Sequence, residues 1–480
     1  MSVSRRKFLM GAGCGIAGAA VGFTAGVFTA ARPGYISASQ IPRAQAVSTQ
    51  ADLPAEADVV VIGGGIAGIS TALFLNEKKL NVVVLEKGVV AGEQSSRAFG
   101  WVYSNHWDLG KYELANQSKR IWSGFASRFD TDVGFRASGN YVIMHTDEEI
   151  SAAEEWLKHA HARDPQCDAR IVSGAAMNAV IAGAGDKYKA MLYQASDGTA
   201  EPVWSVSRIA EGAMREGVKI VAPCAARTIE YAAGRVAGVH TEQGFIKCQN
   251  VVLAGGAWSA LFAENAGYHL PQLSIDSSMM RISSAEGTLP GAGYGPDFVW
   301  RQMANGETSI GVMQHIAPVT KASFKYLTDF FPSLRYSSDL LKITFTRDFF
   351  HSLNMKSRWS AQDITPFEEI RMLSGQVDHT ATQEALANLR RAWPAYQQTT
   401  VKEQWAGIID ASPDSTPYIS AVANRNDIYV ITGFSGNGLT TGPAAGQMLA
   451  QLIAGEQTTC NPHIYRFNRF SDGSPFTFRH

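Results

Sequence analysis

Three glycines and one glutamate form the most specific chemical pattern in this sequence of 480 residues. Gly63, Gly65 and Gly68 stand in G-x-G-x-x-G spacing directly after the apolar run Val59–Ile62, which is typical of a buried strand. The first glycine permits a tight turn, and the second lets the backbone approach a pyrophosphate. The third lets the following helix lie close on the strand. The N–H groups at the start of that helix then point at the phosphates.

A second apolar run, Val82–Leu85, ends at Glu86, whose carboxylate is placed to accept hydrogen bonds from a ribose hydroxyl. The strand, the glycine turn, a helix over 70–78 and the acid occur in the order that a dinucleotide site needs. We therefore predict dinucleotide binding rather than a structural turn. The acid would repel the ribose phosphate of NADP, but it does not separate NAD from FAD. The same turn and strand end add Ile66, Ala67 and Lys87 to the predicted site.

Later segments distinguish these two cofactors. A strand over 219–221, a hairpin over 235–247 and the buried strand Val251–Leu253 lead into a turn at Ala254 and Gly255. Flavoproteins with a dinucleotide fold return to their first sheet in this order, whereas NAD-only dehydrogenases do not usually do so. The order therefore predicts FAD as the cofactor.

A second glycine turn precedes a helix predicted over 442–453 and contains Gly433, Gly436 and Gly438. Backbone N–H groups at such a helix start suit the electron-rich edge of a flavin ring. The small and polar residues over 92–97, followed by a glycine, suit a loop that runs along the flavin. These segments add the predicted cofactor contacts Gln94, Ser95, Ser96, Arg97, Gly100, Ala226, Leu439 and Thr440. We expect non-covalent FAD, because no cysteine or histidine stands beside Arg97 or Asn437, the usual linkage positions.

The chain is too long for a single hydrophobic core. We predict an α/β fold with two domains, a Rossmann-like FAD domain and a substrate domain with a mixed sheet. The FAD domain is expected over 57–135, 195–265 and 405–460, and the substrate domain over 136–194 and 266–404. Further helices are expected over 114–129, 148–161, 204–216 and 384–392.

The composition narrows the class of partner. Hydrophobic residues make up 45% and charged residues 18% of the chain, which suits a large core and a buried ligand. The net charge is −1 and no long basic run follows the N-terminus, so nucleic acid is not an expected partner. The five cysteines lack metal-ligand spacing and the histidines are isolated, so we predict no metal site.

The N-terminal segment resembles an export signal. Residues 4–10 read Ser-Arg-Arg-Lys-Phe-Leu-Met, which is typical of a twin-arginine signal, and we assign residues 1–46 to a signal and linker. The uncharged stretch Phe8–Ala31 is long enough to span a bilayer, so a cleaved leader and a retained membrane anchor both fit. The twin-arginine translocase would then be a partner, and the protein is expected on the periplasmic side of the inner membrane.

Residues 317–357 stand apart in composition. Phenylalanine and leucine side chains alternate there with lysines and arginines. A buried helical pair and a face that contacts a membrane both explain this pattern.

Taken together, these motifs resemble the FAD-dependent D-amino-acid-oxidase superfamily, and within it the membrane-associated bacterial L-amino acid deaminases. The likeness runs through the leader, Glu86-Lys87-Gly88, the loop over 92–97, Ala254-Gly255-Gly256, the aromatic and basic insertion, Gln404-Trp405-Ala406-Gly407 and the last glycine turn. It therefore covers nearly the whole chain.

The resemblance implies oxidation of an amino acid at the carbon that bears nitrogen, with a 2-oxo acid and ammonia as products. It also implies electron transfer to quinone of the respiratory chain. The deaminases carry their carboxylate-binding arginine where this chain has Arg301. Arginine suits that task because its guanidinium donates two parallel hydrogen bonds.

The sequence departs from the deaminases at two positions of the expected pocket. Trp101 stands where they have a glutamine that helps bind the carboxylate, and Asn437 stands where they have a tryptophan. We expect Trp101, Asn437 and Arg301 to contact the substrate. Because the two departures put an α-amino acid substrate in question, oxidation of secondary amines or polyamines is the alternative. A flavin-binding protein without turnover is a further alternative.

Overall fold

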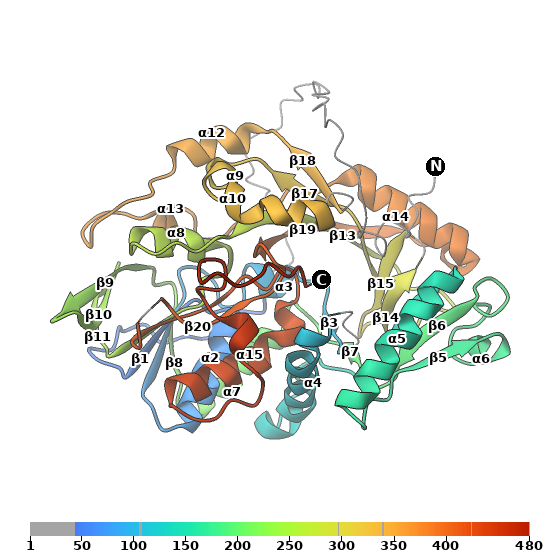
Figure 1. Ribbon diagram of the computed structural model, residues 1–480, viewed down its shortest axis with the longest axis horizontal. Coiled ribbons are helices and arrows are strands. Elements are labelled where there is room, and N and C mark those ends of the chain that lie inside the picture. Colours follow the sequence, from blue (N-terminus) through green and yellow to red (C-terminus); the bar gives the residue numbers. More distant parts are fainter. Residues whose placement is uncertain (1–43, 105–107, 296, 338–339, 424, 480) are drawn as a thin grey trace.

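The computed structural model describes residues 44–104, 108–295, 297–337, 340–423 and 425–479 (Figure 1). Residues 1–43 of the predicted leader lie outside this range. Within the described residues, no helix combines the length and apolar character needed to cross a bilayer.

A largely parallel sheet forms the first domain. Its strands follow the order β20 (Tyr418–Ala421), β21 (Ile428–Thr432), β12 (Asn250–Leu253), β1 (Val59–Ile62), β2 (Val82–Leu85) and β8 (Lys219–Val221). Neighbouring strands run parallel except for β20, which pairs antiparallel with β21. The carboxyl ends of β1, β2, β12 and β21 therefore meet at one edge, where ligands bind in open α/β sheets.

Side chains of this sheet alternate between two hydrophobic cores. Val59 and Val61 pack against α2 (Ile66–Glu77), α4 (Leu109–Phe129), α7 (Ser205–Arg215) and α15 (Gly438–Ile453). Val60 and Ile62 face α8 (Ser259–Asn265) and a three-stranded sheet of β9 (Ala226–Ala232), β10 (Arg235–Thr241) and β11 (Gly244–Lys247). Because successive residues of a strand point to opposite faces, four consecutive apolar residues serve both cores.

A larger mixed sheet forms the second domain. Its order is β18 (Leu341–Thr344), β17 (His315–Pro318), β13 (Leu273–Ile282), β16 (Thr308–Gly311), β15 (Phe298–Gln302), β14 (Ala292–Gly295), β4 (Asn140–Met144), β6 (Ala190–Gln194) and β5 (Arg170–Ser173), while β19 (Val401–Ala411) pairs with β13. Helix α14 (His379–Ala392) packs on one face with Phe298 and Trp300, whereas α5 (Asp147–Arg163) packs on the other with Val142 and Met144. The α/β class predicted from the sequence is confirmed.

Short elements complete the fold. They are α3 (Gln94–Arg97), β3 (Trp101–Val102), α6 (Ala175–Asn178), β7 (Gly198–Thr199), α13 (Pro366–Glu369) and the 3₁₀ turns η1 (Gly256–Trp258), η3 (Pro394–Tyr396) and η4 (His463–Tyr465). Strand β19 crosses the predicted domain boundary at residue 405, because its whole length pairs with β13.

Several helices, including α2, α4, α14 and α15, begin earlier than the sequence pattern predicts. Helices α4 and α14 start after Asp108 and Asp378, whose carboxylates accept hydrogen bonds from first-turn backbone N–H groups. Helix α15 starts at Gly438 and continues through Pro443. The proline has no N–H for the carbonyl of Leu439, and Trp122 Nε1 donates to that carbonyl instead, at 2.8 Å. Side-chain partners therefore explain the extensions of α4, α14 and α15.

The insertion over 317–357 contains α9 (Lys321–Lys325), α10 (Leu327–Phe330), η2 (Phe331–Ser333), α11 (Leu334–Ser337), β18 and α12 (Arg347–Asn354), and Figure 1 shows it at the top of the view. The alternative of a buried helical pair is wrong, because Phe324, Phe331 and Ile343 expose 62%, 61% and 64% of their surface.

The C-terminal segment returns to the cofactor domain. Arg469 pairs with the buried Asp414 at 2.8 Å, and Lys111 Nζ donates to the backbone carbonyl of Arg479 at 2.6 Å. The ring of Phe478 stacks on Tyr336 of the insertion with centroids 5.1 Å apart. The segment thus bridges the first domain and the insertion.

Candidate active site

A cavity of about 1250 Å³ is lined by residues of both domains and begins at the edge where β1, β2 and β12 end. Ligand pockets usually hold roughly 300–1,000 Å³. The space therefore accommodates a large cofactor and a substrate beside it.

Most of the predicted cofactor residues line this cavity. They are Gly63, Gly65, Ile66, Ala67, Glu86, Lys87, Gln94, Ser95, Arg97, Gly100, Ala226, Ala254, Gly255, Gly436, Gly438, Leu439 and Thr440. Three others, Gly68, Ser96 and Gly433, are not among its lining residues. A Cβ on Gly68 would lie 2.0 Å from the carbonyl oxygen of Gly63, so this glycine is needed for helix packing.

At Gly63 the turn after β1 leaves no room for a side chain. Gly63 has a φ of +119°, and a Cβ there would lie 2.3 Å from the carbonyl oxygen of Ala254. The N–H of Ile66 donates to Ser95 Oγ at 3.0 Å, and no side chain caps α2 at Gly65. The other N–H groups of the first turn are thus available to an anionic ligand.

Glu86 organises the ribose end of the cavity. Its two carboxylate oxygens accept hydrogen bonds from the N–H groups of Gly64 and Gly88, both at 2.8 Å. Burial raises the pKa of Glu86, while the charge of Lys87 acts in the opposite direction. Lys87 itself pairs with Glu93 at 2.7 Å and lies over the ring of Trp258.

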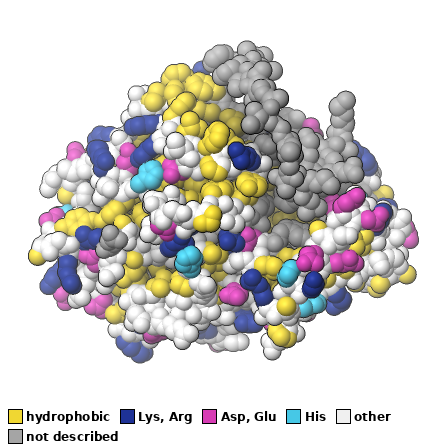
Figure 2. Space-filling model, viewed as in Figure 1, with side chains coloured by type: hydrophobic (Ala, Val, Ile, Leu, Met, Phe, Trp, Pro, Cys, Tyr) yellow, Lys and Arg dark blue, Asp and Glu magenta, His cyan; other side chains and the backbone are white. Residues whose placement is uncertain are grey.

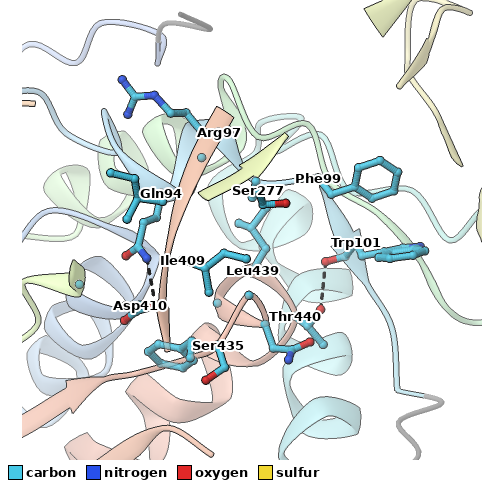
Figure 3. A pocket seen from close by; sticks show the side chains of 18 of the residues that line it. Gln94, Arg97, Phe99, Trp101, Ser277, Ile409, Asp410, Ser435, Leu439 and Thr440 are labelled. Atoms are coloured by element: carbon cyan, nitrogen blue, oxygen red, sulfur yellow. Dashed lines mark hydrogen bonds between the residues drawn. The ribbon is translucent and has the colours of Figure 1, made fainter. Parts of the chain in front are cut away.

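The second glycine turn is held by Asp410, a residue that the motif analysis missed. Its carboxylate accepts a hydrogen bond from Gln94 Nε2 at 3.0 Å (Figure 3). It also accepts hydrogen bonds from Gly433 N–H at 2.7 Å and Thr432 Oγ1 at 3.1 Å. Burial raises the pKa of Asp410. Asp410 stands near the end of β19, 23 residues before Gly433, so its place beside the turn depends on the pairing of distant strands.

The arrangement fits FAD. Helices α2 and α15 both open on the cavity with N-termini that no side chain caps, and Glu86 supplies a ribose acceptor. Cys224 also lines the cavity, but burial raises the pKa of its thiol to about 11, so it is a protonated thiol and a poor nucleophile. No group of three His, Cys, Asp or Glu residues in the described part of the chain is arranged to hold a metal ion.

Aromatic rings form one wall of the remaining space. Trp101 stacks on Tyr294 with centroids 4.6 Å apart, and it contacts Phe99 at 4.9 Å and Tyr103 at 5.4 Å. All four rings line the cavity. Figure 3 shows Phe99 and Trp101 on the same side of the β3 segment. No local pattern pointed to Tyr294, because it comes from the distant strand β14.

Trp101 and Asn437, which the sequence placed in the pocket, both line the cavity. The ring of Tyr103 lies 5.4 Å from that of Trp101, and its hydroxyl donates to Asn437 Oδ1 at 3.2 Å. Thr440 Oγ1 donates to the backbone carbonyl of Trp101 at 3.1 Å. The start of α15 and the β3 segment are thus joined by two hydrogen bonds.

Arg301 is placed differently. It is 2% exposed, does not line the cavity, and lies behind Gly100, where a Cβ would meet Arg301 Nε at 2.9 Å. Its Nη1 is 3.1 Å from Glu201 Oε1, although the two atoms are not aligned as a hydrogen bond. The guanidinium therefore contacts Glu201, and its role as a carboxylate clamp stays a prediction.

His315 is a cavity residue to which the sequence analysis assigned no role. Burial lowers the pKa of its imidazole to about 4, so the ring is neutral near pH 7. Its Nδ1 is buried without a hydrogen-bond partner among the described residues.

The family model of DAO, the FAD dependent oxidoreductases, matches residues 58–452. The chain belongs to this family. The L-amino acid deaminase of Proteus myxofaciens, solved in complex with anthranilate, is 30% identical, with a TM-score of 0.86 over 90% of this chain and 98% of that one.

Two further relatives have names that refer to oxidation of an amine or an amino acid. The sarcosine oxidase subunit beta of Rhizobium meliloti is 26% identical over 87% of this chain and 89% of that protein. The glycine oxidase of Pseudomonas putida is 25% identical over 85% of this chain and 97% of that protein. This DAO protein is therefore an FAD-dependent oxidoreductase that acts on amino acids or amines, which confirms the family, cofactor and enzyme class predicted from the sequence.

Proposed function

We propose that the protein oxidises the carbon–nitrogen bond of an amino acid to give a 2-oxo acid and ammonia. The cavity supports this proposal, because a single cavity is lined both by the glycine turn after β1 and by the aromatic wall that contains Trp101 and Tyr294. The overall likeness to an L-amino acid deaminase supports an amino acid as the substrate.

The residues of the chain would serve mainly to position the substrate. FAD, when bound, supplies the acceptor for the two electrons that leave the carbon–nitrogen bond. The imine product then takes up water, releasing ammonia and the 2-oxo acid. Apolar side chains such as Met279, Val299 and Ile409 line the cavity and keep the reacting carbon away from bulk water.

An anaerobic screen tests this function. Purified holoprotein is mixed with amino acids and amines while the absorbance of the oxidised flavin is followed, and the 2-oxo acid and ammonia are quantified. Bleaching by an amino acid with equal amounts of both products is expected. If no amino acid or amine bleaches the flavin, the protein is a flavin-binding protein without turnover.

Oxidation of secondary amines or polyamines is the second candidate function. The placement of Arg301 favours it, because a guanidinium next to Glu201 and behind Gly100 contributes no carboxylate-binding group to the cavity lining. A product assay separates the two functions, since amines give an aldehyde and no 2-oxo acid.

We further propose that the protein works on the periplasmic face of the inner membrane after twin-arginine export. The insertion supports contact with a membrane. Figure 2 shows hydrophobic side chains gathered over it. Phe345 and Phe350 expose 58% and 56% of their surface, and Lys342 and Arg347 are exposed beside them. Aromatic and basic side chains together suit the headgroup layer of a bilayer.

In this setting electrons would leave the reduced protein for membrane quinone, giving quinol.

Replacing Phe324, Phe345 and Phe350 with serine should shift the protein from anionic vesicles to the soluble fraction. The same replacements should slow quinone reduction while leaving anaerobic flavin bleaching unchanged. A protein lacking residues 1–46 that leaves vesicles entirely and produces stoichiometric peroxide would contradict both the membrane contact of the insertion and the quinone acceptor.

A further inference from the structure

Residues 476–479, which we call the C-terminal strap, lie beside the cavity. Phe478 of the strap lines the cavity. Its ring stacks on Tyr336 of α11, with centroids 5.1 Å apart and ring planes only 4° apart. Figure 1 shows the C-terminal segment, in dark red, below the insertion. Two segments that are distant in the sequence thus meet at this side of the cavity.

The stacked pair stands where the cavity reaches the surface. Tyr336 lines the cavity and yet exposes 51% of its surface. Arg335 beside it also lines the cavity and is exposed. Leu340 lines the cavity as well, and its carbonyl accepts a hydrogen bond from the N–H of His315 at 2.8 Å, which attaches this part of the insertion to β17. Side chains that face both the cavity and the solvent mark its mouth.

The strap is anchored on the first domain through its backbone. Lys111 Nζ donates to the carbonyl of Arg479 at 2.6 Å, and the N–H of Arg479 donates to the carbonyl of Asp414 at 2.9 Å. Arg479 Nη1 also lies 3.3 Å from both carboxylate oxygens of Asp108. These contacts hold the residue after Phe478, whereas the Phe478 ring is joined to the insertion by stacking.

The strap lies beside the second glycine turn. Lys111 Nζ donates to the carbonyl of Ser415 at 3.3 Å, and the N–H of Ser415 donates to the carbonyl of Ser412 at 3.2 Å. The N–H of Ser412 in turn donates to Ser435 Oγ at 3.1 Å. Ser435 lines the cavity two residues before Asn437, which we expect to contact the substrate. The mouth therefore opens on the side of the cavity that receives the substrate.

The two kinds of contact differ in strength. One aromatic stack changes an equilibrium by about two- to tenfold, so it favours a closed mouth without locking it. The backbone anchors act together and include a charged donor, so they hold the strap more firmly. The Phe478 ring can therefore leave Tyr336 by a side-chain rotation while the strap stays in place.

We propose that Phe478 and Tyr336 form a gate at the mouth of the cavity and that this gate sets how large a substrate the protein accepts. The inference rests on the proposed oxidation of an amino acid or amine, because it concerns the ligand of the same cavity. A small ligand fits inside and lets the rings stack again behind it. A ligand with a long side chain keeps the rings apart, and its binding loses the contribution of the stack.

The first experiment uses three probes that cannot be oxidised at a carbon bearing nitrogen and hydrogen. Anthranilate is the small probe, and 2-amino-4-phenylbenzoate and 2-amino-5-phenylbenzoate carry an added ring at two different positions. Each probe has both an amine and a carboxylate, so it suits either candidate function. Stopped-flow measurement of flavin absorbance in the holoprotein gives the association and dissociation rates, and their ratio gives the affinity.

Two changes are expected for Phe478→Ala. The affinity for at least one phenyl-substituted probe should rise about two- to tenfold relative to that for anthranilate, because the stack is no longer lost on binding. Association and dissociation of anthranilate should both accelerate by the same factor, because a gate that closes behind a small ligand changes rates and not the equilibrium. Tyr336→Ala should give the same pattern. The double variant should add nothing to either single one, since the rings act as a pair.

Phe476→Ala is the matched control. Phe476 belongs to the same strap and is half-buried like Phe478, but its ring packs on Phe470 and does not line the cavity. It should match the parent with all three probes. Parent-like rates and affinities in Phe478→Ala and Tyr336→Ala, additive effects in the double variant, the same changes in Phe476→Ala, or a parent that binds none of the probes would overturn the inference.

A second comparison addresses the anchor. Lys111→Met keeps the length of the side chain but removes the hydrogen bond to the carbonyl of Arg479. It should accelerate anthranilate exchange in the same way as Phe478→Ala but by a smaller factor, with FAD content unchanged. Lys189→Met, in an exposed ion pair with Asp147, is the control. Rates equal to those of the parent in Lys111→Met would refute the anchoring role of this lysine.

The third experiment uses turnover. Anaerobic flavin bleaching is measured with the smallest and the largest amino acid or amine that bleach the parent. In Phe478→Ala the ratio of their half-saturating concentrations, large over small, should fall about two- to tenfold. An unchanged ratio would contradict the control of substrate size by the gate. If no amino acid or amine bleaches the parent, the proposed function is refuted, and the exchange rates of the probes still judge the gate.

Discussion

The two halves of the cavity are built in different ways. In the cofactor half, backbone atoms approach each other so closely that Gly63 and Gly68 cannot accept a Cβ. In the substrate half, the wall is a cluster of rings from β3, the segment after it and β14. The first is specified by short-range spacing in the sequence, and the second by contacts between distant segments.

This difference predicts different responses to substitution. A change in the cofactor half should disturb backbone geometry, and therefore FAD binding and folding together. A change in the aromatic wall should leave FAD bound and alter which substrate is preferred.

The largest effect is expected for Gly68→Val. The new Cβ would lie 2.0 Å from the carbonyl oxygen of Gly63, so β1 and α2 must separate. Stability should fall by more than about 4 kcal/mol and bound FAD should be lost. Thermal unfolding and FAD released per protein measure this. Gly124→Ala is the control, because no atom lies within 4 Å of that Cβ and a helical glycine gains about 0.5–1 kcal/mol on replacement. Retention of FAD by Gly68→Val would contradict the expected separation of β1 and α2.

Arg301 lies at the border between the halves. Arg301→Ala removes the ion-pair partner of the buried Glu201, which should cost about 3–5 kcal/mol of unfolding free energy. The double variant Arg301→Ala/Glu201→Ala should recover part of this loss. Bleaching by L-phenylalanine and 2-phenylethylamine should fall by similar factors. A normal melting temperature with selective loss of L-phenylalanine turnover would instead support the carboxylate clamp.

Glu86→Gln tests the cofactor half without adding bulk. The amide can accept only one of the two hydrogen bonds from Gly64 and Gly88, and its NH₂ group faces the other N–H. FAD affinity of the reconstituted apoprotein should fall by about ten- to a hundredfold, because charge-assisted hydrogen bonds are lost. Glu77→Gln, in a surface ion pair with Arg128, should leave affinity unchanged.

Trp101→Gln tests the aromatic wall. Removing the indole opens the stack with Tyr294, so the ranking of substrates in the anaerobic screen should change by about tenfold or less. FAD content should equal that of the parent. A parallel loss of FAD would show that the two halves are not separable.

The smallest effect on the two halves of the cavity is expected at Asp276 of β13, which does not line it. Burial raises its pKa to about 7. The native state therefore binds a proton that the unfolded chain has released, and the resulting stability is present below about pH 4 and lost as pH rises towards 7. Asp276→Asn should remove this component of the pH dependence between pH 4 and 7. Melting temperatures of parent and variant across that range would be compared, and parallel curves would contradict the assignment.

The difference between the two halves of the cavity explains which site residues could be predicted from the sequence. Gly63, Gly65 and Glu86 were identified from spacing, because a phosphate site requires particular backbone conformations within a short segment. Tyr294 and Asp410 were missed, because their places depend on strand pairing. The contact between Arg301 and Glu201 could not be predicted either, since nothing local indicates which face of β15 closes over Gly100.

The C-terminal segment has a practical consequence for handling the protein. Phe478 lines the cavity and stacks on the insertion, so an affinity tag appended at this end would begin beside the substrate. Under the proposed twin-arginine export, a tag at the other end would precede Arg5 and Arg6 and interfere with their recognition. The hairpin turn at Ala233 and Gly234 is a better site, because it is exposed and no atom lies within 4 Å of a Cβ on Gly234. An internal tag placed there should permit purification of FAD-loaded protein with its cavity unobstructed.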